Sequence, residues 1–324
     1  MTTFLGVDGG GSKTAFLLID ESGRVLASHT EGPAYYLEIG WEALHSMLAR
    51  GIRATLDLSS VSAADLDYAF IGLPAYGEDS KSLAQLDAAP SPSLEPRRYR
   101  CGNDAACAWA GALACADGIN LVAGTGSIGY GEFDGRTARA GGWGELFSDE
   151  GSAHWMAREA LSLFSRMSDG RTERGPWYDM VRTHFGLPSD LDLCAAIYGD
   201  GRTGRSQVAT LAPLVARAAA AGDAQVVALF ARAADELTRI VDAVYDQLAI
   251  PAHAAVPVSY SGGMFNERQL LLDPFLANLS RDTRSYRAAP PILPPVAGAA
   301  LYAAKLNGTP LGVQAIHRLR SNLP

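Results

Sequence analysis

One pattern constrains the fold more than any other feature of the sequence: a strand, a glycine-rich turn and a second strand, which together occur twice. In the first copy, apolar segments flank a turn at residues 9–14. In the second copy, apolar segments flank a turn at residues 124–127. Two such units in one chain indicate a duplicated architecture rather than one isolated loop.

Other periodic segments predict the elements around these two units. Residues 4–8, 15–19 and 24–29 are short apolar runs separated by turns, which predicts an antiparallel meander. Apolar residues recur at helical spacing in 41–58 and 223–248. Further expected elements are strands at 68–73, 119–123, 128–133 and 256–261 and helices at 206–221 and 296–306.

The first turn has the chemistry of a phosphate cradle, and its residues are Gly9, Gly10, Gly11, Ser12, Lys13 and Thr14. Glycines allow positive φ and lack the Cβ that would block a phosphate, so consecutive N–H groups can point at anionic oxygens. Ser12 and Thr14 add hydroxyl donors, and Lys13 adds a positive charge. The Walker pattern does not fit, because Ser12 stands where lysine is required and a strand follows the turn. A simple β-turn is the alternative, although it would need fewer glycines.

Two further features belong to phosphate chemistry. Asp8 ends the strand before the first turn, where a carboxylate can hold a water-coordinated Mg²⁺ against the β- and γ-phosphates of a nucleotide. A turn cap is the alternative role for this residue. The second turn offers another set of N–H groups and hydroxyls, and its residues are Gly124, Thr125, Gly126 and Ser127. One such turn is weak evidence, but two could clamp a polyphosphate from both sides.

Asp104 lies near the start of an expected helix, directly after Asn103. A general base that accepts a proton from a sugar hydroxyl would occupy such a position. A helix cap, served by Asp104 or Asn103, would occupy it as well. Position alone does not separate these two roles.

The segment 141–153 combines glycines, an aromatic side chain and carboxylates. Trp143 offers a flat apolar face, and Glu145, Asp149 and Glu150 can accept hydrogen bonds from hydroxyl groups. Binding sites for sugars combine apolar stacking with a few polar groups that fix orientation. We therefore interpret this segment as a sugar-binding loop.

Composition and charge exclude several classes of protein. With 48% hydrophobic and 19% charged residues, the 324-residue chain has the balance of a soluble globular protein. The formal charge of −8 argues against a nucleic-acid partner, which requires a basic surface. No apolar run is long enough for a membrane span and no basic leader precedes the first strand, so a cytoplasmic enzyme is expected. The cysteines form no CxxC pair and no Cys/His cluster at zinc spacing, and they are expected to be buried free thiols; they are Cys101, Cys107, Cys115 and Cys194.

Taken in order, the motifs resemble those of the BadF/BadG/BcrA/BcrD ATPase family, and within it the N-acetylglucosamine kinases of the actin-like superfamily. The resemblance rests on residues 8–14, 103–105, 124–127 and 141–153, with 261–263 and 296–300 resembling the adenosine and second connecting motifs. It implies an α/β fold of two RNase H-like, actin-like ATPase lobes with ATP in the cleft between them. The implied lobes are residues 1–116, completed by about 307–324, and residues 117–306 with a helical insertion.

The resemblance also assigns roles to individual residues. It makes Asp8 the Mg²⁺ ligand and Asp104 the catalytic base. The implied sugar contacts are Tyr35, Asp104, Trp143, Asp149 and Ala153, and the implied adenosine contacts are Gly262 and Gly263. The implied reaction is ATP-dependent phosphorylation of an amino sugar, N-acetylglucosamine to its 6-phosphate. No nucleic-acid or membrane partner is expected, and a homodimer is an assembly left open.

Two positions depart from the kinase pattern, and two other classes of protein are weighed against it. Tyr35 and Ile128 stand where these kinases usually have asparagine on the sugar-facing side, so glucosamine and other sugars stay open as acceptors. One rival is the ATPase activator of 2-hydroxyacyl-CoA dehydratase or benzoyl-CoA reductase, but no cysteine is placed as its iron–sulfur ligands are. The other is a sugar-sensing repressor, which would carry a helix-turn-helix ahead of a core that here starts at residue 4.

Overall fold

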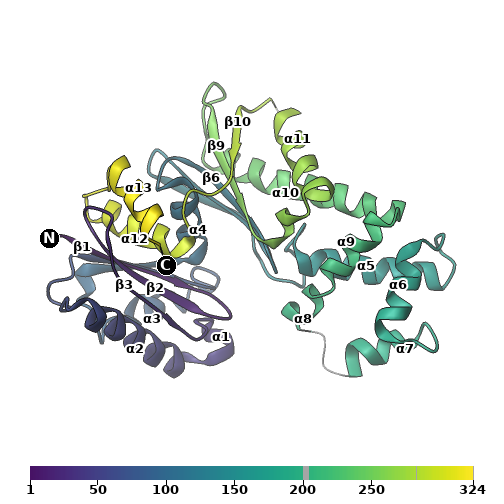
Figure 1. The fold of residues 1–324 in the computed structure, drawn as a ribbon, viewed down its shortest axis with the longest axis horizontal. Coiled ribbons are helices and arrows are strands. Elements are labelled where there is room, and N and C mark those ends of the chain that lie inside the picture. Colours follow the sequence, from purple (N-terminus) through teal and green to yellow (C-terminus); the bar gives the residue numbers. More distant parts are fainter. Residues whose placement is uncertain (200–203, 282, 324) are drawn as a thin grey trace. The chain divides into compact units, whose positions relative to one another are not determined.

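The computed structural model describes residues 1–199, 204–281 and 283–323, which form two compact units (Figure 1). The first unit is Met1–Asn120 with Pro290–Pro324, and the second is Leu121–Ala289. Each unit contains a five-stranded sheet with helices, and each sheet includes one of the two glycine-turn hairpins. The expected α/β fold of two related lobes is confirmed. No helix in the described part of the chain is long and apolar enough to cross a membrane.

The first sheet has the strand order β3-β2-β1-β4-β5. Its strands are β1 (Thr3–Gly9), β2 (Thr14–Asp20), β3 (Val25–Glu31), β4 (Tyr68–Leu73) and β5 (Tyr99–Asn103). The first three form the expected antiparallel meander, whereas β1, β4 and β5 run parallel. The carboxyl ends of parallel strands lie at one edge of a sheet. Asp8 near the end of β1 and Asp104 directly after β5 are therefore brought to the same edge.

Helices of the first unit pack on this sheet and on one another. They are α1 (Tyr36–Ile39), α2 (Trp41–Ser59), α3 (Leu83–Ala88), α4 (Asp104–Leu113), α12 (Pro295–Leu306) and α13 (Val313–Asn322), with a 3₁₀ turn at Pro96–Arg98. On α2, Leu44, Leu48 and Ile52 are fully buried, as the helical spacing predicts. Gly298 lets α12 pack tightly against α4, because a Cβ there would overlap the backbone of Gly111.

The C-terminal segment that completes the first unit is longer than the sequence indicates. The expected boundary left residues up to 306 in the second lobe, whereas the structure groups Pro290–Pro324 with the first unit. The reason is α12, which packs against β1 and α4. A Cβ at Gly6 in β1 would lie 2.6 Å from the carbonyl oxygen of Val296, so the helix rests directly on the strand backbone.

The second sheet has the strand order β10-β9-β6-β7-β8. Its strands are β6 (Gly118–Ala123), β7 (Ser127–Phe133), β8 (Arg136–Gly141), β9 (Val256–Ser261) and β10 (Tyr286–Ala289). β7 and β8 pair antiparallel, and β9 and β10 pair parallel. The two edge strands, β8 and β10, are not apparent from the sequence, because their side chains are largely exposed or half-buried and give no apolar alternation.

The helices of the second unit lie between β8 and β9 and between β9 and β10 in the chain. They are α5 (Ala153–Ser168), α6 (Pro176–Phe185), α7 (Asp192–Cys194), α8 (Arg205–Ala209), α9 (Ala212–Ala220), α10 (Ala224–Gln247) and α11 (Asp273–Arg281), with a 3₁₀ turn at Gly263–Asn266 and π-helical turns at Ala195–Gly199 and Arg268–Leu272. The prediction of a single helix at 206–221 is wrong. The segment forms the two helices α8 and α9, because Pro213 stands in the first turn of α9 and starts a new helix there.

The cysteines are free thiols in different surroundings. Cys101 and Cys107 are buried, as expected, and Cys115 is partly buried. The expectation is wrong for Cys194, which is exposed on the short helix α7.

Candidate active site

The first glycine-rich turn joins β1 to β2 as a tight hairpin. Gly9 pairs with Thr14, and the Gly10 N–H donates to the Lys13 carbonyl oxygen at 3.0 Å. The loop after β3 is bonded to the same turn, because the Ala34 N–H donates to the Gly10 carbonyl oxygen at 2.9 Å. The hairpin predicted from the sequence is confirmed, and a neighbouring loop holds it in place.

The glycines of this turn are required for space and not for left-handed backbone. No residue of the turn has a positive φ, so the expectation that these glycines supply that conformation is wrong. A Cβ at Gly9 would lie 2.7 Å from the Gly72 carbonyl oxygen, because the hairpin packs against β4. Gly11 has open space around it, and the next two residues, Ser12 and Lys13, are exposed. This end of the turn is the part that an anionic ligand can approach.

Thr14 braces the hairpin. Its side chain is fully buried, and its hydroxyl donates to the Gly32 carbonyl oxygen at 2.8 Å. This bond ties β2 to the loop after β3. The exposed side chains of Ser12 and Lys13 are therefore better placed than Thr14 to meet a phosphate.

Asp8 carries a carboxyl group that the surrounding protein disfavours as an anion. Burial is the largest cause that raises the pKa of Asp8 from 3.8 to about 7, and the negative charge of Asp104 adds to it. The positive charge of Lys13 acts in the opposite direction. A divalent cation beside Asp8 would favour the charged form of this group. The residue therefore fits the role of a Mg²⁺ ligand at the glycine-rich turn.

Asp104 is the first residue of α4, and the residue before it caps this helix. Asn103 Oδ1 accepts a hydrogen bond from the Ala105 N–H at 3.0 Å, and its Nδ2 donates to the Tyr76 carbonyl oxygen at 3.1 Å. Because Asn103 fills the capping role, Asp104 is not needed for it. The Asp104 carboxyl group stands at the positive end of the helix dipole, where an anionic proton acceptor would be suited.

Gly72 of β4 allows Asp104 to approach Asp8. β4 lies between β1 and β5, and Gly72 pairs with Asp8. A Cβ at Gly72 would overlap the Sγ of Cys107 and lie 3.2 Å from the Cα of Asp104. The Cys107 thiol donates a hydrogen bond to the Val7 carbonyl oxygen, with Sγ 3.6 Å from that oxygen. The first turn of α4 can rest on these strands only because position 72 has no side chain.

Tyr35 lies on the loop that is bonded to the first turn. It directly follows Ala34, whose N–H reaches the turn, and it precedes α1. Its ring is partly buried and packs against the core of the first unit. Tyr35, which the resemblance assigns to the sugar, therefore lies next to the first glycine-rich turn, and its ring contacts the core of the unit.

The second glycine-rich turn connects β6 to β7 and supports the start of α5. The Gly124 N–H donates to the Gly126 carbonyl oxygen at 2.8 Å. The N–H groups of Ala153 and His154 donate to the carbonyl oxygens of Gly124 and Thr125 at 2.9 and 3.2 Å. Ala153 is thus brought beside the turn, and the turn and the helix start form one bonded unit.

Asp149 is fully buried against this second turn. Its Oδ1 accepts a hydrogen bond from the Ser127 N–H at 3.3 Å, and its Oδ2 lies 2.6 Å from Nη2 of Arg205. A Cβ at Gly126 would overlap the same guanidinium. Burial raises the pKa of Asp149, and Arg205 opposes that change. The hydroxyl of Ser127 is also used within the protein, since it donates to the Glu150 carbonyl oxygen at 2.7 Å.

Trp143 stands in an exposed loop after β8. Its side chain is 73% exposed, so an indole face is available to a ligand. Gly142 and Gly144 on either side have φ of 67° and 101°, a backbone region that favours glycine. A Cβ at Gly142 would lie 2.9 Å from Cδ1 of Ile128, which supports the loop from β7. Ile128 therefore contributes apolar packing at this position.

Gly262 and Gly263 follow β9 and lie near the second turn. Gly262 has φ of 106°, and a Cβ there would overlap the Ala123 carbonyl group and lie 2.9 Å from the Gly124 nitrogen. Gly263 has open space around it. The segment that resembles the adenosine motif is thus a spatial neighbour of the second glycine-rich turn.

Known proteins match this chain over most of its length. The sequence pattern of the BadF/BadG/BcrA/BcrD ATPase family matches residues 5–303. The chain belongs to this family. The resemblance inferred from the motifs is confirmed.

Among relatives of this BadF/BadG/BcrA/BcrD ATPase, the N-acetylmuramic acid/N-acetylglucosamine kinase of Clostridium acetobutylicum is 31% identical over 85% of this chain and 89% of its own. The N-acetyl-D-glucosamine kinase of Dictyostelium discoideum is 25% identical over 83% of this chain and 88% of its own. A solved structure of a candidate N-acetylglucosamine kinase from Chromobacterium violaceum is 26% identical and has a TM-score of 0.71, covering 93% of this chain and 98% of that one.

Two residues of this family member contribute to the site without belonging to any of the motifs. Arg205 reaches Asp149 only through the fold, and nothing in its sequence surroundings marks it. Gly72 stands in an apolar strand, and its importance becomes visible when Cys107 and Asp104 are found against it. A glycine inside a buried strand does signal a close approach of other groups, so this residue could have been found from the sequence.

Proposed function

We propose that this protein transfers the γ-phosphoryl group of ATP to a hydroxyl group of an amino sugar, with N-acetylglucosamine as the first acceptor and its 6-phosphate as the product. The observation that carries the proposal is the placement of Asp8 and Asp104 on either side of Gly72 at one edge of the first sheet, beside the glycine-rich turn. One carboxylate suits a metal ion at the phosphates, and the other suits a proton acceptor. The curated relatives, which are kinases of N-acetylglucosamine or N-acetylmuramic acid, support the acceptor class.

Both glycine-rich turns are assigned to the nucleotide. When bound, Mg²⁺–ATP supplies the phosphoryl group together with a cation that offsets its charge. Asp8 would hold the metal ion, and the exposed ends of Ser12 and Lys13 would meet phosphate oxygens. In the second unit, Thr125 and Gly126 offer further N–H groups, since those of Gly124 and Ser127 bond within the protein. The open space at Gly263 leaves room for the adenosine, and Gly262 packs against Ala123 and Gly124.

Asp104 is assigned as the general base. A carboxylate oxygen of this residue accepts the proton of the acceptor hydroxyl as the new bond to phosphorus forms. The N-terminus of α4 favours the ionised form that this step requires. A cation at Asp8 would offset the repulsion between the two carboxylates, so metal binding and base function support each other.

The sugar is assigned to Tyr35, Trp143, Ala153 and Asp149. The exposed indole of Trp143 offers a face on which a sugar ring can stack. Asp149 is already bonded to the Ser127 N–H and to Arg205. A direct hydrogen bond from a sugar hydroxyl to Asp149 therefore requires Arg205 to move away from this carboxylate.

Glucosamine is the second acceptor that we propose to test. The related kinases usually have asparagine where this chain has Tyr35 and Ile128. The Ile128 side chain packs against the Gly142 position, and the Tyr35 ring packs against the core of its unit. Neither residue offers the amide that would bond to an N-acetyl group.

A coupled assay of ATP consumption, run with N-acetylglucosamine, glucosamine, N-acetylmuramate and glucose, tests the proposal. We expect Mg²⁺-dependent turnover with the highest kcat/KM for N-acetylglucosamine, and NMR of the product identifies the phosphorylated hydroxyl. Asp104→Asn should lower kcat by roughly 10²–10⁴-fold with nucleotide affinity retained. Asp57→Asn on the exposed face of α2 is the matched control.

Two results would contradict this assignment. Near wild-type turnover of Asp104→Asn would show that Asp104 is not the general base. A preference for glucose over both amino sugars would show that the acceptor is not an amino sugar. We place the reaction in the cytoplasm, where ATP and Mg²⁺ are available. A homodimer is the assembly to test by light scattering.

A further inference from the structure

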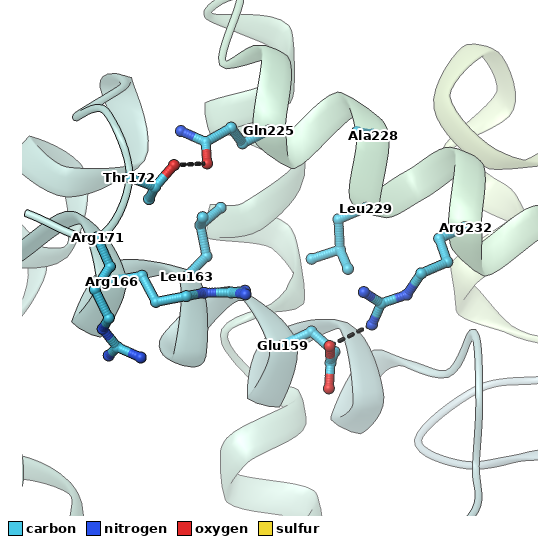
Figure 2. Close-up of a pocket in the computed structure, with 9 residues that line it drawn as sticks. All are labelled: Glu159, Leu163, Arg166, Arg171, Thr172, Gln225, Ala228, Leu229 and Arg232. Carbon is cyan, nitrogen blue, oxygen red and sulfur yellow. Dashed lines mark hydrogen bonds and ion pairs between the residues drawn. The ribbon is translucent and has the colours of Figure 1, made fainter.

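A pocket of about 450 Å³ lies between α5 and α10 in the second unit (Figure 2). Its walls come from the C-terminal half of α5, the turn that follows, and the N-terminal half of α10. None of its lining residues is assigned to the nucleotide or the sugar. Arg166 on its wall is roughly 20 Å along α5 from Ala153, given the rise of 1.5 Å per residue. The pocket is therefore a second site that shares a helix with the candidate active site.

The charge of this pocket is opposite in sign to that of the whole protein. Three arginines and one glutamate line it, an excess of two positive charges on a chain whose formal charge is −8. Among the described residues, the guanidinium of Arg166 makes no hydrogen bond or ion pair, and the residue is exposed. Arg171 is paired with Asp169 at 2.8 Å, but both side chains are largely exposed. Arg166 is thus the cation most available to an anion.

The third cation is held in a fixed orientation. Arg232 forms an ion pair with Glu159 and lies over the ring of Trp155, with its Cζ 4.6 Å from the ring centroid. Figure 2 shows the side chains of Arg166 and Arg232 reaching into the space between the two helices from opposite sides. A guanidinium fixed by its neighbours loses less conformational entropy when it binds a ligand.

The rest of the lining suits a ligand that is larger than an inorganic ion. Leu163 and Leu229 are buried and form apolar wall. Thr172 Oγ1 donates to Gln225 Oε1 at 2.6 Å, so neutral polar groups stand beside the cations. A volume of about 450 Å³ falls in the range of roughly 300–1,000 Å³ that holds small organic ligands.

We propose that this pocket binds a small phosphorylated polyol, such as a sugar phosphate. The phosphate lies at Arg166 and at the N–H groups of Arg232 that do not bond to Glu159, and the hydroxyl groups lie at Gln225 and Glu159. Arginine favours phosphate because its planar fork of N–H groups matches two phosphate oxygens at once. Arg171 at the edge of the pocket adds charge that attracts the anion. This inference does not depend on the reaction proposed above, because none of these residues takes part in it.

Isothermal titration calorimetry with glucose 6-phosphate, inorganic phosphate and glucose tests the proposal on the full-length protein. We expect saturable binding of glucose 6-phosphate, weaker binding of inorganic phosphate and none of glucose. Arg166→Glu should lower the affinity for glucose 6-phosphate by at least about tenfold, and Arg166→Glu/Arg171→Glu should lower it further. Arg217→Glu, an exposed residue of α9 outside the pocket, should leave it unchanged. Thermal denaturation of each variant checks that the fold is kept.

Three outcomes would overturn the inference. Absence of saturable binding would show that the pocket is not a binding site. An unchanged affinity in the double variant would show that the ligand binds elsewhere, for example at the candidate active site. Equal affinities for inorganic phosphate and glucose 6-phosphate would show that the hydroxyl groups are not recognised.

Discussion

Asp8 and Asp104 repel each other at the carboxyl edge of the first sheet. Burial is the main cause that raises the pKa of Asp8 to about 7, and the charge of Asp104 adds to it. Two carboxylates in this arrangement destabilise each other. The Mg²⁺ that we propose to bind at Asp8 would relieve this electrostatic cost.

Asp8→Asn should change how stability depends on pH. A carboxyl group whose pKa is raised on folding stabilises the protein fully below its unfolded pKa, and this contribution is lost as pH rises through about 7. The variant does not have this loss. Its free energy of unfolding, relative to the wild type, should therefore increase by roughly 1–3 kcal/mol between pH 5 and pH 8. Urea denaturation without Mg²⁺ measures it.

Asp57→Asn is the control for this experiment, since Asp57 is an exposed carboxylate in the same unit. It should follow the wild type at every pH. If Asp8→Asn also runs parallel to the wild type, Asp8 does not titrate in this range.

Gly9→Ala and Gly11→Ala should separate folding from phosphate binding. A Cβ at Gly9 would lie 2.7 Å from the Gly72 carbonyl oxygen, so this variant should lose roughly 1–3 kcal/mol of stability. A Cβ at Gly11 meets nothing within the protein, so stability should be kept. The same Cβ stands where the phosphate is proposed to lie, and nucleotide affinity should fall. Equal melting temperatures for the two variants would show that Gly9 is not constrained by β4.

Arg205→Gln should leave the buried carboxylate of Asp149 without its cation. The pKa of Asp149 in the folded protein should then rise. Because the unfolded chain ionises this carboxyl group at a lower pH than the folded protein does, the loss of stability should grow as pH rises. Because Arg205 is partly exposed, we expect a loss of roughly 1–3 kcal/mol at pH 8, below the usual cost for a buried pair.

A double-mutant cycle with Asp149→Asn measures the coupling between these two residues. The combined variant should lose less stability than the sum of the two single variants. Strict additivity at pH 8 would mean that the Asp149–Arg205 contact contributes nothing.

Tyr35→Asn should change the choice of acceptor. The variant introduces an amide at the loop bonded to the first glycine-rich turn, where the resemblance to N-acetylglucosamine kinases implies one. A new hydrogen bond to an N-acetyl group should raise the ratio of kcat/KM for N-acetylglucosamine over glucosamine by about 3–10-fold. Steady-state kinetics with both sugars measures this ratio. An unchanged ratio would show that position 35 does not set specificity.

The parts of the fold that could be predicted are those where local pattern and burial agree. β4 is a continuous apolar run that is mostly buried, and β9 contains two fully buried valines, Val256 and Val258. The bounds of both strands match the expectation from the sequence. β8 lies at a sheet edge with exposed or half-buried side chains, so its residues carry no apolar pattern. Local pattern does not predict a strand such as β8, which is held mainly by pairing with the neighbouring strand.

The candidate site shows the same division. Glycine-rich turns and strand-end carboxylates are visible in the sequence because each is a short local pattern of a few neighbouring residues. The ion pair between Asp149 and Arg205 is not visible in the sequence, because the two residues come from segments that only the fold brings together. The sequence likewise marks Thr14 as a hydroxyl donor, while the fold decides that its partner is the Gly32 carbonyl oxygen.

The packing of α12 on β1 has a consequence for how this protein is made. The ribosome synthesises β1 first and α12 only after the whole of residues 121–289, so the nascent first unit lacks the helix that rests on Gly6. The second unit is one continuous segment and can fold as soon as it emerges. The domain that is translated first is therefore the last to be completed, and until then the part of β1 that α12 covers lacks its partner.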